Sequence, residues 1–518
     1  MDGKSRPALA PHQNGARPAG GRSVSIMATL AAPPTDAAGY LKAAYLKHLT
    51  SAVGYMEVRA DLVGDLDPAA LRANFPGALV YTLRSAAAGG GCADPADRRR
   101  ARLIAAAGRY DYVDIEAPVD LHPDVLAAIA PDRRVLTWPG PAAPTAPALR
   151  RAFDMLSAIP ARLYRMAPRA ETLAQAAAAP LFLKSLARDD VMAYARGPSG
   201  TWTRVLTAKY GAPLVSGWLD DTAAADLKPP PPDGELPLPR LLADYPYQLL
   251  DGVRRLYGII GGQVTMSLAT RMYNAACRSL DLPALFLPFS TQELPRSLAD
   301  FGARLDELGL PLRGATVVRP HKEEAVALAG EASEVARDTG SASLLVRNGA
   351  GWWADNEAAG VLGALRGNGI EVAGRHIAVV GCGGAGRAAA AGLSRAGAEV
   401  TLVNRGAWRG ERAAAMLDLP FVPLREFDPR PFSVLVHATP AVDEPPLLPT
   451  GFDPAMVIFD LNYRTKDTPL IAAARAAGHP TIDGRDMLLA ELPRQFRLMT
   501  GRSMPAAEAG AALARTEG

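Results

Sequence analysis

The chain has 518 residues, too many for one ordinary hydrophobic core, and this length suggests about three domains. Its formal net charge of +3 is close to neutral, so the composition indicates neither a nucleic-acid nor a membrane partner. The cysteines Cys92, Cys277 and Cys382 show no paired spacing, which argues against a disulfide framework or a metal site. No apolar run approaches the length of a membrane span, and we expect a cytoplasmic protein.

Residues 1–22 are rich in Pro, Gly, Ala and Arg and lack the apolar core of a signal peptide. A disordered tail is the expectation, with an organellar transit sequence as the alternative. Short apolar strands then alternate with Ala- and Leu-rich helices. The eight strand candidates are 25–30, 54–58, 79–83, 112–115, 134–137, 162–165, 190–194 and 213–216. Such alternation predicts a TIM-type (β/α)₈ barrel over 23–240, although it fits an open doubly wound sheet equally well.

The alternation stops at a run of four prolines, Pro229–Pro232. Consecutive prolines remove backbone donors and favour an extended polyproline II geometry, so a linker is expected in this region. The strand–helix pattern restarts at residue 255. We therefore predict that residues 241–252 link the barrel to a second α/β region.

A glycine-rich turn joins an apolar strand to an Ala-rich helix in the C-terminal half. The strand begins at His376 and leads into Gly381, Gly383, Gly384, Ala385 and Gly386, which fit G-x-G-x-x-G. In that motif the first glycine permits the tight turn, the second lets the backbone approach a pyrophosphate, and the last lets helix pack on strand. The free N–H groups and positive dipole end of the helix would bind the phosphates. This context predicts a Rossmann dinucleotide site.

The end of the following strand selects between the two nicotinamide cofactors. Versions that bind NAD place an acid there for the ribose 2′-hydroxyl. Here the strand ends in Asn404, followed by Arg405 and Arg409, with no acid. Two guanidinium groups can pair with a 2′-phosphate through charge-assisted hydrogen bonds, so NADP is the predicted cofactor.

Motifs in a fixed order around the glycine loop resemble those of shikimate dehydrogenases. They are the segments 258–274, 314–322, 355–360, 438–440, 460–463, 484–488 and 500–501. The resemblance implies a substrate-binding lobe (253–359), a Rossmann lobe (360–485) and C-terminal helices (486–518) that return to the substrate lobe. It implies Lys322 as the proton-transferring lysine, Glu357 as its acid partner, and Thr439 in the cofactor site.

The first half resembles type I 3-dehydroquinate dehydratase, so the whole chain is similar to the fused dehydratase–dehydrogenase of the shikimate pathway. The resemblance rests on the segments 56–61, 82–85, 113–116 and 200–204. It implies that Glu57, Arg59, Arg84, Glu116 and Arg204 survive from a binding site. The Schiff-base lysine aligns with Arg162 and the proton-transfer histidine with Pro139. A guanidinium stays protonated and cannot act as an amine nucleophile, which predicts an inactive barrel.

The substrate shell also departs from the shikimate dehydrogenase pattern. The residues that align with substrate-binding positions are Ser267, Thr316, Ser343, Asp355, Tyr463 and Glu491. The second hydroxyl position is Ala269, and Glu357 replaces an aspartate. Asp355 and Glu491 replace neutral amides, and such acids repel an anionic substrate unless they are protonated or paired.

Three functions are compatible with these residues. The leading hypothesis is an NADP-dependent dehydrogenase that interconverts 3-dehydroshikimate and shikimate, or a close cyclitol relative. The second is a dehydrogenase repurposed for a related cyclitol bearing an amine, which the acids at 355 and 491 would favour. The third is a non-catalytic protein that binds NADP and anionic ligands, suggested by the changes in both sites.

Overall fold

The structure is a computed structural model that describes residues 24–31, 53–219, 233–463 and 467–514. The predicted tail (1–22) and the proline run Pro229–Pro232 lie outside these ranges. Contacts divide the chain into two compact units, the first reaching Arg254 and including Pro288–Thr291 and Ser297–Pro311. Within the described ranges, no helix is long and apolar enough to cross a membrane.

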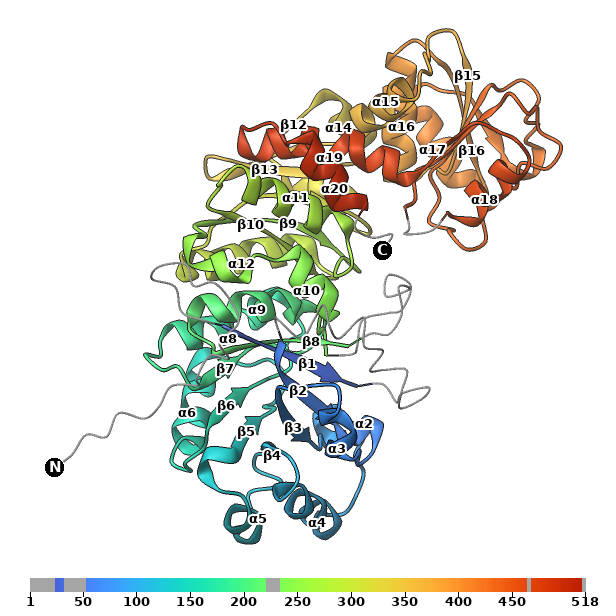
Figure 1. Cartoon of the computed structure of the whole chain (residues 1–518). Helices are drawn as coiled ribbons and strands as arrows, with labels where there is room; N and C mark the ends of the chain where they lie inside the picture. The colour runs from blue at the N-terminus through green and yellow to red at the C-terminus, as the bar shows by residue number, and fades with distance from the viewer. Residues whose placement is uncertain (1–23, 32–52, 220–232, 464–466, 515–518) are drawn as a thin grey trace. The chain divides into compact units, whose positions relative to one another are not determined.

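The first unit is a nearly closed barrel of parallel strands, in blue to green in Figure 1. Its strands are β1 (Ser25–Leu30), β2 (Val53–Arg59), β3 (Ala78–Thr82), β4 (Tyr112–Glu116), β5 (Arg134–Trp138), β6 (Leu163–Met166), β7 (Val191–Ala193) and β8 (Leu214–Trp218). They follow the order β7-β6-β5-β4-β3-β2-β1-β8, and every recorded pair in it is parallel. The predicted barrel is therefore confirmed, and the open doubly wound sheet is excluded.

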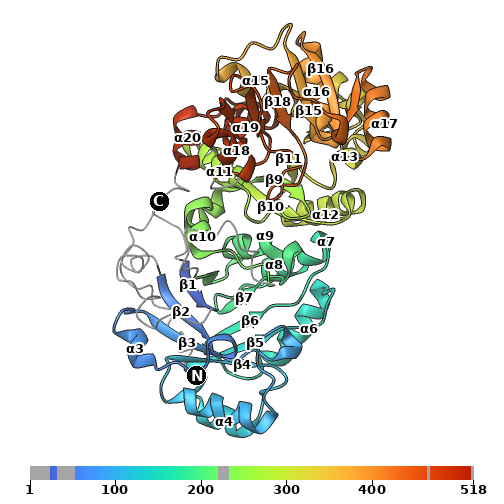
Figure 2. The same ribbon diagram turned by 90° about the vertical axis from the view of Figure 1, so that its right-hand side faces the viewer.

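Helices cover the outside of this barrel, as the turned view in Figure 2 shows. They are α2 (Ala60–Val63), α3 (Pro68–Arg72), α4 (Ala96–Ala107), α5 (Pro123–Ala128), α6 (Ala146–Leu156), α7 (Leu173–Ala176), α8 (Ala178–Lys184), α9 (Thr201–Leu206) and α10 (Leu238–Asp244). Contacts also group most of α12 (Leu294–Leu308) with this unit. Because helices cover the outside of the sheet, most strand residues are buried, including charged ones such as Glu57, Asp114 and Arg165. The expected linker, 241–252, contains the end of α10 and a 3₁₀ turn, Tyr247–Gly252.

The second unit contains two six-stranded sheets. The first is mixed, in the order β10-β9-β11-β13-β14-β12. Its strands are β9 (Arg255–Gly261), β10 (Ala284–Ser290), β11 (Leu312–Val317), β12 (Glu331–Ala332), β13 (Leu344–Asn348) and β14 (Gly351–Asp355). Its helices are α11 (Leu268–Ser279), α13 (Lys322–Leu328), α14 (Glu334–Thr339) and, from the end of the chain, α19 (Gly484–Thr500) and α20 (Ala506–Ala514).

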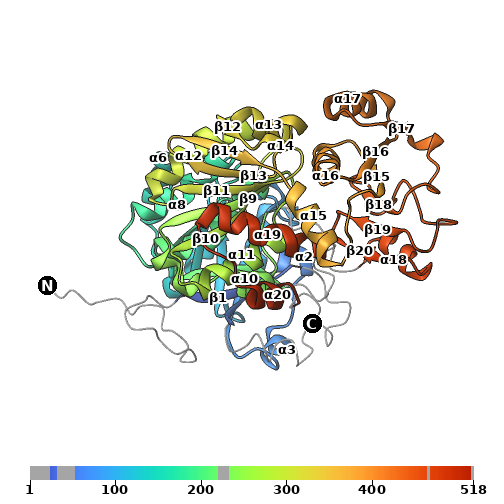
Figure 3. The same cartoon turned by 90° about the horizontal axis from the view of Figure 1, so that it is seen from above.

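The second sheet is entirely parallel, in the order β17-β16-β15-β18-β19-β20 (Figure 3). Its strands are β15 (His376–Val380), β16 (Glu399–Asn404), β17 (Phe421–Pro423), β18 (Val434–His437), β19 (Val457–Asp460) and β20 (Thr481–Ile482). Helices α15 (Ala358–Gly367), α16 (Gly384–Arg395), α17 (Ala407–Leu417) and α18 (Pro469–Ala476) accompany it. The strand order reverses between β15 and β18, and ligands of such sheets bind at this switch point, beyond the carboxyl ends of the strands.

Helix α19 brings the end of the chain back to the first sheet of this unit. Its start is fixed by a reciprocal cap in which Asp483 accepts from the backbone of Asp486 and Asp486 accepts from that of Asp483. The helix packs Leu492, Phe496 and Met499 into the same core as α11. The side chains of α19 that lie between these apolar positions are thereby held over the ends of β11 and β14.

Candidate active site

A buried ion pair joins two segments that are 35 residues apart in sequence. Lys322 is the first residue of α13, and Glu357 precedes α15. The Lys322 ammonium donates to Oε1 of Glu357, whose side chain is almost fully buried. Burial by itself would raise the pKa of Glu357, but the charge and hydrogen bond of Lys322 outweigh it and lower that pKa. The structure thus holds an ionised carboxylate beside an ammonium group.

This ion pair lies next to the glycine loop. A Cβ atom on Gly384 would lie 3.4 Å from Cβ of Lys322 and 2.3 Å from Oγ of Ser341. Arg387, on the first turn of α16, donates to the Thr339 carbonyl at 2.8 Å and to Glu323 at 2.7 Å. The base of the Lys322 side chain therefore lies against the start of α16, within the glycine loop.

Four side-chain hydroxyls come from four separate segments of this unit, and one of them, that of Ser343, is close to Glu357. The hydroxyls of Ser267 and Tyr463 are 3.2 Å apart, although 196 residues separate them in the chain. The Thr316 hydroxyl donates to Gln495 on α19 at 2.7 Å. Ser343 lies close enough to Glu357 for its hydroxyl to contribute to the lowered pKa of that carboxylate. This set of groups is suited to a ligand that carries several hydroxyls.

The two acids that replace amides are both neutralised. Asp355 accepts from the Arg494 guanidinium and from the Ser333 hydroxyl, the latter at 2.6 Å. Burial raises the pKa of Glu491 to about 8, with Glu357 and Asp355 adding to the rise against the effects of Arg494 and Gln495. One acid is therefore paired and the other is mostly protonated near pH 7. Unpaired acids at these positions would repel an anionic substrate, but the paired Asp355 and the protonated Glu491 do not.

The glycine loop has the geometry that a pyrophosphate requires. Gly381 has φ of +113°, in the region that favours glycine. A Cβ on Gly386 would lie 1.7 Å from the Gly381 carbonyl oxygen, so no side chain fits there. A Cβ on Gly383 would meet nothing within 4 Å, which leaves the backbone open to a ligand. The N-terminus of α16 follows, and these features together fit a dinucleotide phosphate.

The strand ends on either side of the loop carry the remaining cofactor candidates. The Asn404 side chain accepts from the Cys382 backbone at 3.3 Å, while Arg405 and Arg409 are exposed. The charge of Arg409 reaches the loop, since together with Arg387 it offsets part of the burial that raises the pKa of the Cys382 thiol to about 11. Arg405 and Arg409 are therefore accessible to an anionic group beyond β16.

On the other side of the switch point, Thr439 follows β18 and touches the glycine loop. Its Cγ2 lies 2.9 Å from where a Cβ on Gly381 would be. His437 bridges the Thr439 hydroxyl, at 2.6 Å, and the carboxylate of Asp460, at 3.0 Å. Burial would raise the pKa of Asp460, but the His437 interaction and two other hydrogen bonds lower it. The Asp460 carboxylate therefore fixes the His437 ring that contacts Thr439.

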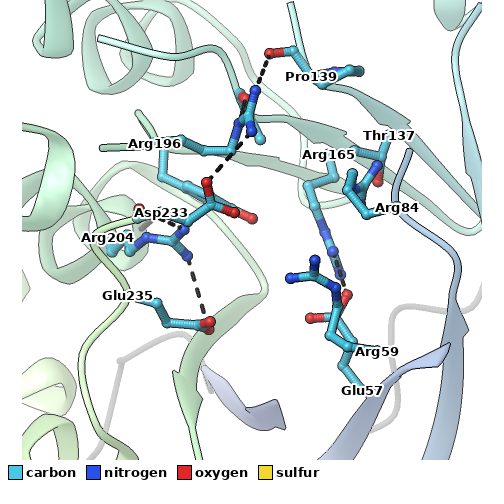
Figure 4. A pocket seen from close by; sticks show the side chains of 12 residues that line it. Glu57, Arg59, Arg84, Thr137, Pro139, Arg165, Arg196, Arg204, Asp233 and Glu235 are labelled. Atoms are coloured by element: carbon cyan, nitrogen blue, oxygen red, sulfur yellow. Dashed lines mark hydrogen bonds and ion pairs between the residues drawn. The ribbon is translucent and has the colours of Figure 1, made fainter. Parts of the chain in front are cut away.

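The barrel contains a separate polar cavity (Figure 4). It is lined by Glu57, Arg59, Arg84, Thr137, Pro139, Arg165, Ala167, Tyr194, Arg196, Arg204, Asp233 and Glu235. Four of the six expected barrel residues are among them. Glu116 is buried and accepts from the backbone and hydroxyl of Ser85, at 2.9 and 2.5 Å, and from Arg84 at 3.4 Å.

Arg162, the expected counterpart of the Schiff-base lysine, does not line the cavity. It precedes β6, whereas Arg165, within β6, lines the cavity. The position along the strand matters because alternate residues of a strand point to opposite faces. Arg165 reaches Glu57 at 2.5 Å and Asp114 at 3.5 Å. Burial would raise the pKa of Glu57, but Arg165 together with Arg59 and Thr82 outweighs it and lowers that pKa to about 2.

Comparison with known proteins assigns the two halves. Residues 41–229 match the family model of type I 3-dehydroquinase, and residues 259–345 match that of the shikimate dehydrogenase substrate binding domain. The shikimate dehydrogenase (NADP(+)) of Syntrophobacter fumaroxidans is 36% identical over 264 residues, which are 48% of this chain and 88% of that protein. The second half of the chain belongs to the shikimate dehydrogenase family.

Other known proteins are also similar to this chain. The shikimate dehydrogenase (NADP(+)) of Methanocella arvoryzae is 34% identical over 260 residues, 48% of this chain and 94% of that protein. The chloroplastic bifunctional 3-dehydroquinate dehydratase/shikimate dehydrogenase of Arabidopsis thaliana is 26% identical over 333 residues, 60% of this chain and 53% of that protein. A solved shikimate dehydrogenase from Thermus thermophilus, in complex with shikimate, covers 50% of this chain and 98% of its own at 30% identity and a TM-score of 0.45.

The predicted site residues leave out several side chains that contact them in the structure. Arg494 and Gln495 were not predicted, although they lie three and four residues after Glu491 on the same helix. That helical spacing places them beside it and is the signal that could have found them. His437 and Asp460 each end a neighbouring parallel strand, which could have indicated their contact.

Proposed function

We propose that the second half of the chain is an NADP-dependent shikimate dehydrogenase that interconverts 3-dehydroshikimate and shikimate. The observation that carries this proposal is the buried Lys322–Glu357 pair beside the glycine loop. It supports Lys322 as the proton donor to a ring ketone bound next to a dinucleotide. The names of the relatives from Syntrophobacter and Methanocella support the same substrate and cofactor.

The nicotinamide cofactor supplies the hydride for ketone reduction and takes it back in the reverse direction. The Lys322 ammonium would donate a proton to the ketone oxygen during reduction, and the resulting neutral amine would take a proton from the alcohol during oxidation. Glu357 is ionised and accepts a hydrogen bond from Lys322, so it would orient the lysine. Ser267, Tyr463, Thr316 and Ser343 would hold the carboxylate and ring hydroxyls of the substrate.

The residues that would hold NADP fall into two groups. The backbone from Gly381 to Gly386 would bind the pyrophosphate at the N-terminus of α16. Arg405 and Arg409 would pair with the 2′-phosphate, with Asn404 between them and the loop. Thr439 would contact the half of the cofactor on the other side of the switch point. The three cysteines are buried and unpaired, which supports the reducing cytoplasm as the location.

The test is NADP-linked oxidation of shikimate by the purified chain, compared with its Lys322→Ala variant. We expect the variant to lose about 10²–10⁴-fold in turnover, the usual contribution of a positioned acid–base group. Its NADP affinity should change little, because the lysine lies on the substrate side of the loop. If the native chain does not oxidise shikimate, the proposed function is wrong. If the Lys322→Ala variant keeps a substantial rate, Lys322 does not have the proposed role.

We propose further that the barrel does not dehydrate 3-dehydroquinate through a Schiff base. Arg165 occupies the cavity position on β6 where a lysine would be required, and its guanidinium stays charged. Two described lysines of the barrel are engaged elsewhere, with Nζ of Lys184 on the Glu307 carbonyl at 2.6 Å and Nζ of Lys209 on the Leu250 carbonyl at 3.0 Å. Neither belongs to the cavity wall. The proton-transfer position is Pro139, which lines the cavity without a titratable group.

Borohydride treatment with 3-dehydroquinate, followed by intact-mass measurement, tests this second proposal. The native chain should show no adduct and form no dehydroshikimate. The variant Arg165→Lys, which places an amine at the same cavity position, serves as the matched comparison. An adduct and measurable product from the native chain would show that another lysine performs the reaction.

A further inference from the structure

The inner face of α19 carries a chain of hydrogen bonds that ends beside the catalytic pair. Thr316 donates to Gln495, and Gln495 donates to Oε1 of Glu491 at 2.9 Å. Arg494, three residues after Glu491 on the same helix, pairs with Asp355 at the end of β14. Its Nη1 atom lies 4.0 Å from Oε1 of Glu491. Each of the two acids that stand in place of amides is thus in contact with a residue of α19.

Two buried polar atoms of this network, Oε2 of Glu491 and Nη1 of Arg494, lack a hydrogen-bond partner among the described residues. A buried polar atom without a partner is costly, so two of them in one neighbourhood indicate groups that a ligand satisfies. One of the atoms is a carboxyl oxygen and the other is a donor. Ring hydroxyls, which both donate and accept, match this combination.

We propose that Arg494 determines substrate specificity by neutralising Asp355 and donating from Nη1 to a ring hydroxyl, while Glu491 acts as a neutral carboxylic acid. The inference rests on the proposed dehydrogenase function and names the substrate class of that site. The Asp355–Arg494 pair offers an acceptor and a donor, as one asparagine amide would. A protonated Glu491 likewise offers one donor and one acceptor, as glutamine would.

The charges that face Glu491 agree with this assignment. Arg494 shares its helix, Asp355 and Glu357 face it from the ends of β14 and the start of α15, and Tyr273 faces it from α11. Burial is the main cause of the raised pKa of Glu491, about 8, and the two neighbouring carboxylates add to it. Lys322 and Arg494 balance Glu357 and Asp355, so the set is neutral while Glu491 holds its proton. Such a site favours uncharged hydroxyls over an ammonium group on the ring.

The first experiment measures the shikimate Kd by calorimetry in the presence of NADP, together with KM and kcat. Arg494→Ala leaves Asp355 as a buried, unpaired anion near the substrate carboxylate, and we expect Kd and KM to rise about tenfold to a hundredfold. The NADP affinity should stay constant. Adding Asp355→Asn to Arg494→Ala removes the unpaired charge and should restore most of the shikimate affinity. Arg497→Ala, an exposed arginine on the same helix, is the matched control.

The second experiment follows the shikimate Kd with pH. Glu491 loses its proton as the pH rises through about 8, so native binding should weaken above that pH. Glu491→Gln should abolish this alkaline weakening, whereas Glu491→Ala should weaken binding at every pH. A shikimate Kd for Arg494→Ala equal to that of Arg497→Ala would overturn the inference. The inference would also be overturned if the double variant bound shikimate no more tightly than Arg494→Ala, or if the shikimate Kd of the native chain did not change with pH.

The outcomes separate this inference from the proposed function. A native chain that binds shikimate without turning it over contradicts the dehydrogenase assignment, but the variant series in Kd still decides the role of Arg494. A native chain that binds no shikimate overturns both. A ring amine that binds more tightly than its hydroxyl counterpart overturns the neutral-site inference alone.

Discussion

Replacing both Arg405 and Arg409 by alanine should weaken the binding of NADP much more than the binding of NAD. Hydrogen bonds to a charged group contribute about 1.5–3 kcal/mol each, and the exposure of both side chains argues for the lower end. Two such contacts give about 3 kcal/mol, or roughly a hundredfold rise in the NADP Kd. NAD has no 2′-phosphate, so its Kd should change only a few-fold.

The assay is a calorimetric titration of both cofactors at low and high salt. Because the two arginines are exposed, added salt should reduce the difference in NADP Kd between the native chain and the variant. Arg425→Ala provides the control, since Arg425 is also an exposed arginine of the Rossmann sheet region and pairs with Glu426 at 3.0 Å. It should leave both affinities close to native.

Equal losses for NADP and NAD would refute the reasoning, because they would mean that the arginines support the loop and not the 2′-phosphate. A loss of NADP affinity in Arg425→Ala as large as in the double variant would also refute it. That result would show a general effect of positive charge.

Three further changes test other parts of the structure. Gly386→Ala places a Cβ 1.7 Å from the Gly381 carbonyl oxygen, so the loop must move by more than 1 Å. The affinity for NADP and for NAD, measured by titration, should therefore fall to the same extent. Unchanged affinity would show that the loop adapts to the added methyl group. Glu357→Gln leaves Lys322 without its ionised partner and should lower kcat at least tenfold with a smaller change in the NADP Kd; an unchanged kcat would limit Glu357 to a structural role. The lowered pKa of Asp460 means that its carboxylate stabilises the fold above the unfolded-state pKa, and that this stability disappears as pH falls through the folded-state pKa. Asp460→Asn should therefore lower Tm at neutral pH by several degrees, and the difference from native should shrink in acid; a constant difference would contradict the linkage.

The sequence predicted the barrel strands closely because alternation of buried strands and helices is a local pattern. Each of the eight candidates overlaps an observed strand, with ends that differ by no more than two residues. The same pattern does not specify which residues of a strand face the interior. Arg162 was assigned to the cavity on motif alignment, while the closed barrel turned Arg165 inward. Orientation within β6 depends on pairing with β5 and β7, which no local window contains.

The glycine loop could also be predicted from the sequence, because the backbone geometry that requires glycine arises within a few neighbouring residues. The positive φ of Gly381 and the contact between Gly386 and the Gly381 carbonyl arise within six residues. Glycine is the residue type that meets such requirements, so the motif reports the geometry directly. The arginines after β16 follow the same logic, since the end of the second strand lies beside the loop in any such sheet.

The sequence by itself determined the elements, the glycine loop and the identity of the substrate-site acids. Only the tertiary structure decided the charge of those acids. Asp355 is neutralised by Arg494, which lies 139 residues further along the chain, and Glu491 keeps its proton because packing buries it beside two other carboxylates. Residue type fixes the unperturbed pKa, but burial and the distance to other charges fix the actual one. Both quantities are set when α19 folds back over β11 and β14, and neither can be read from any single segment.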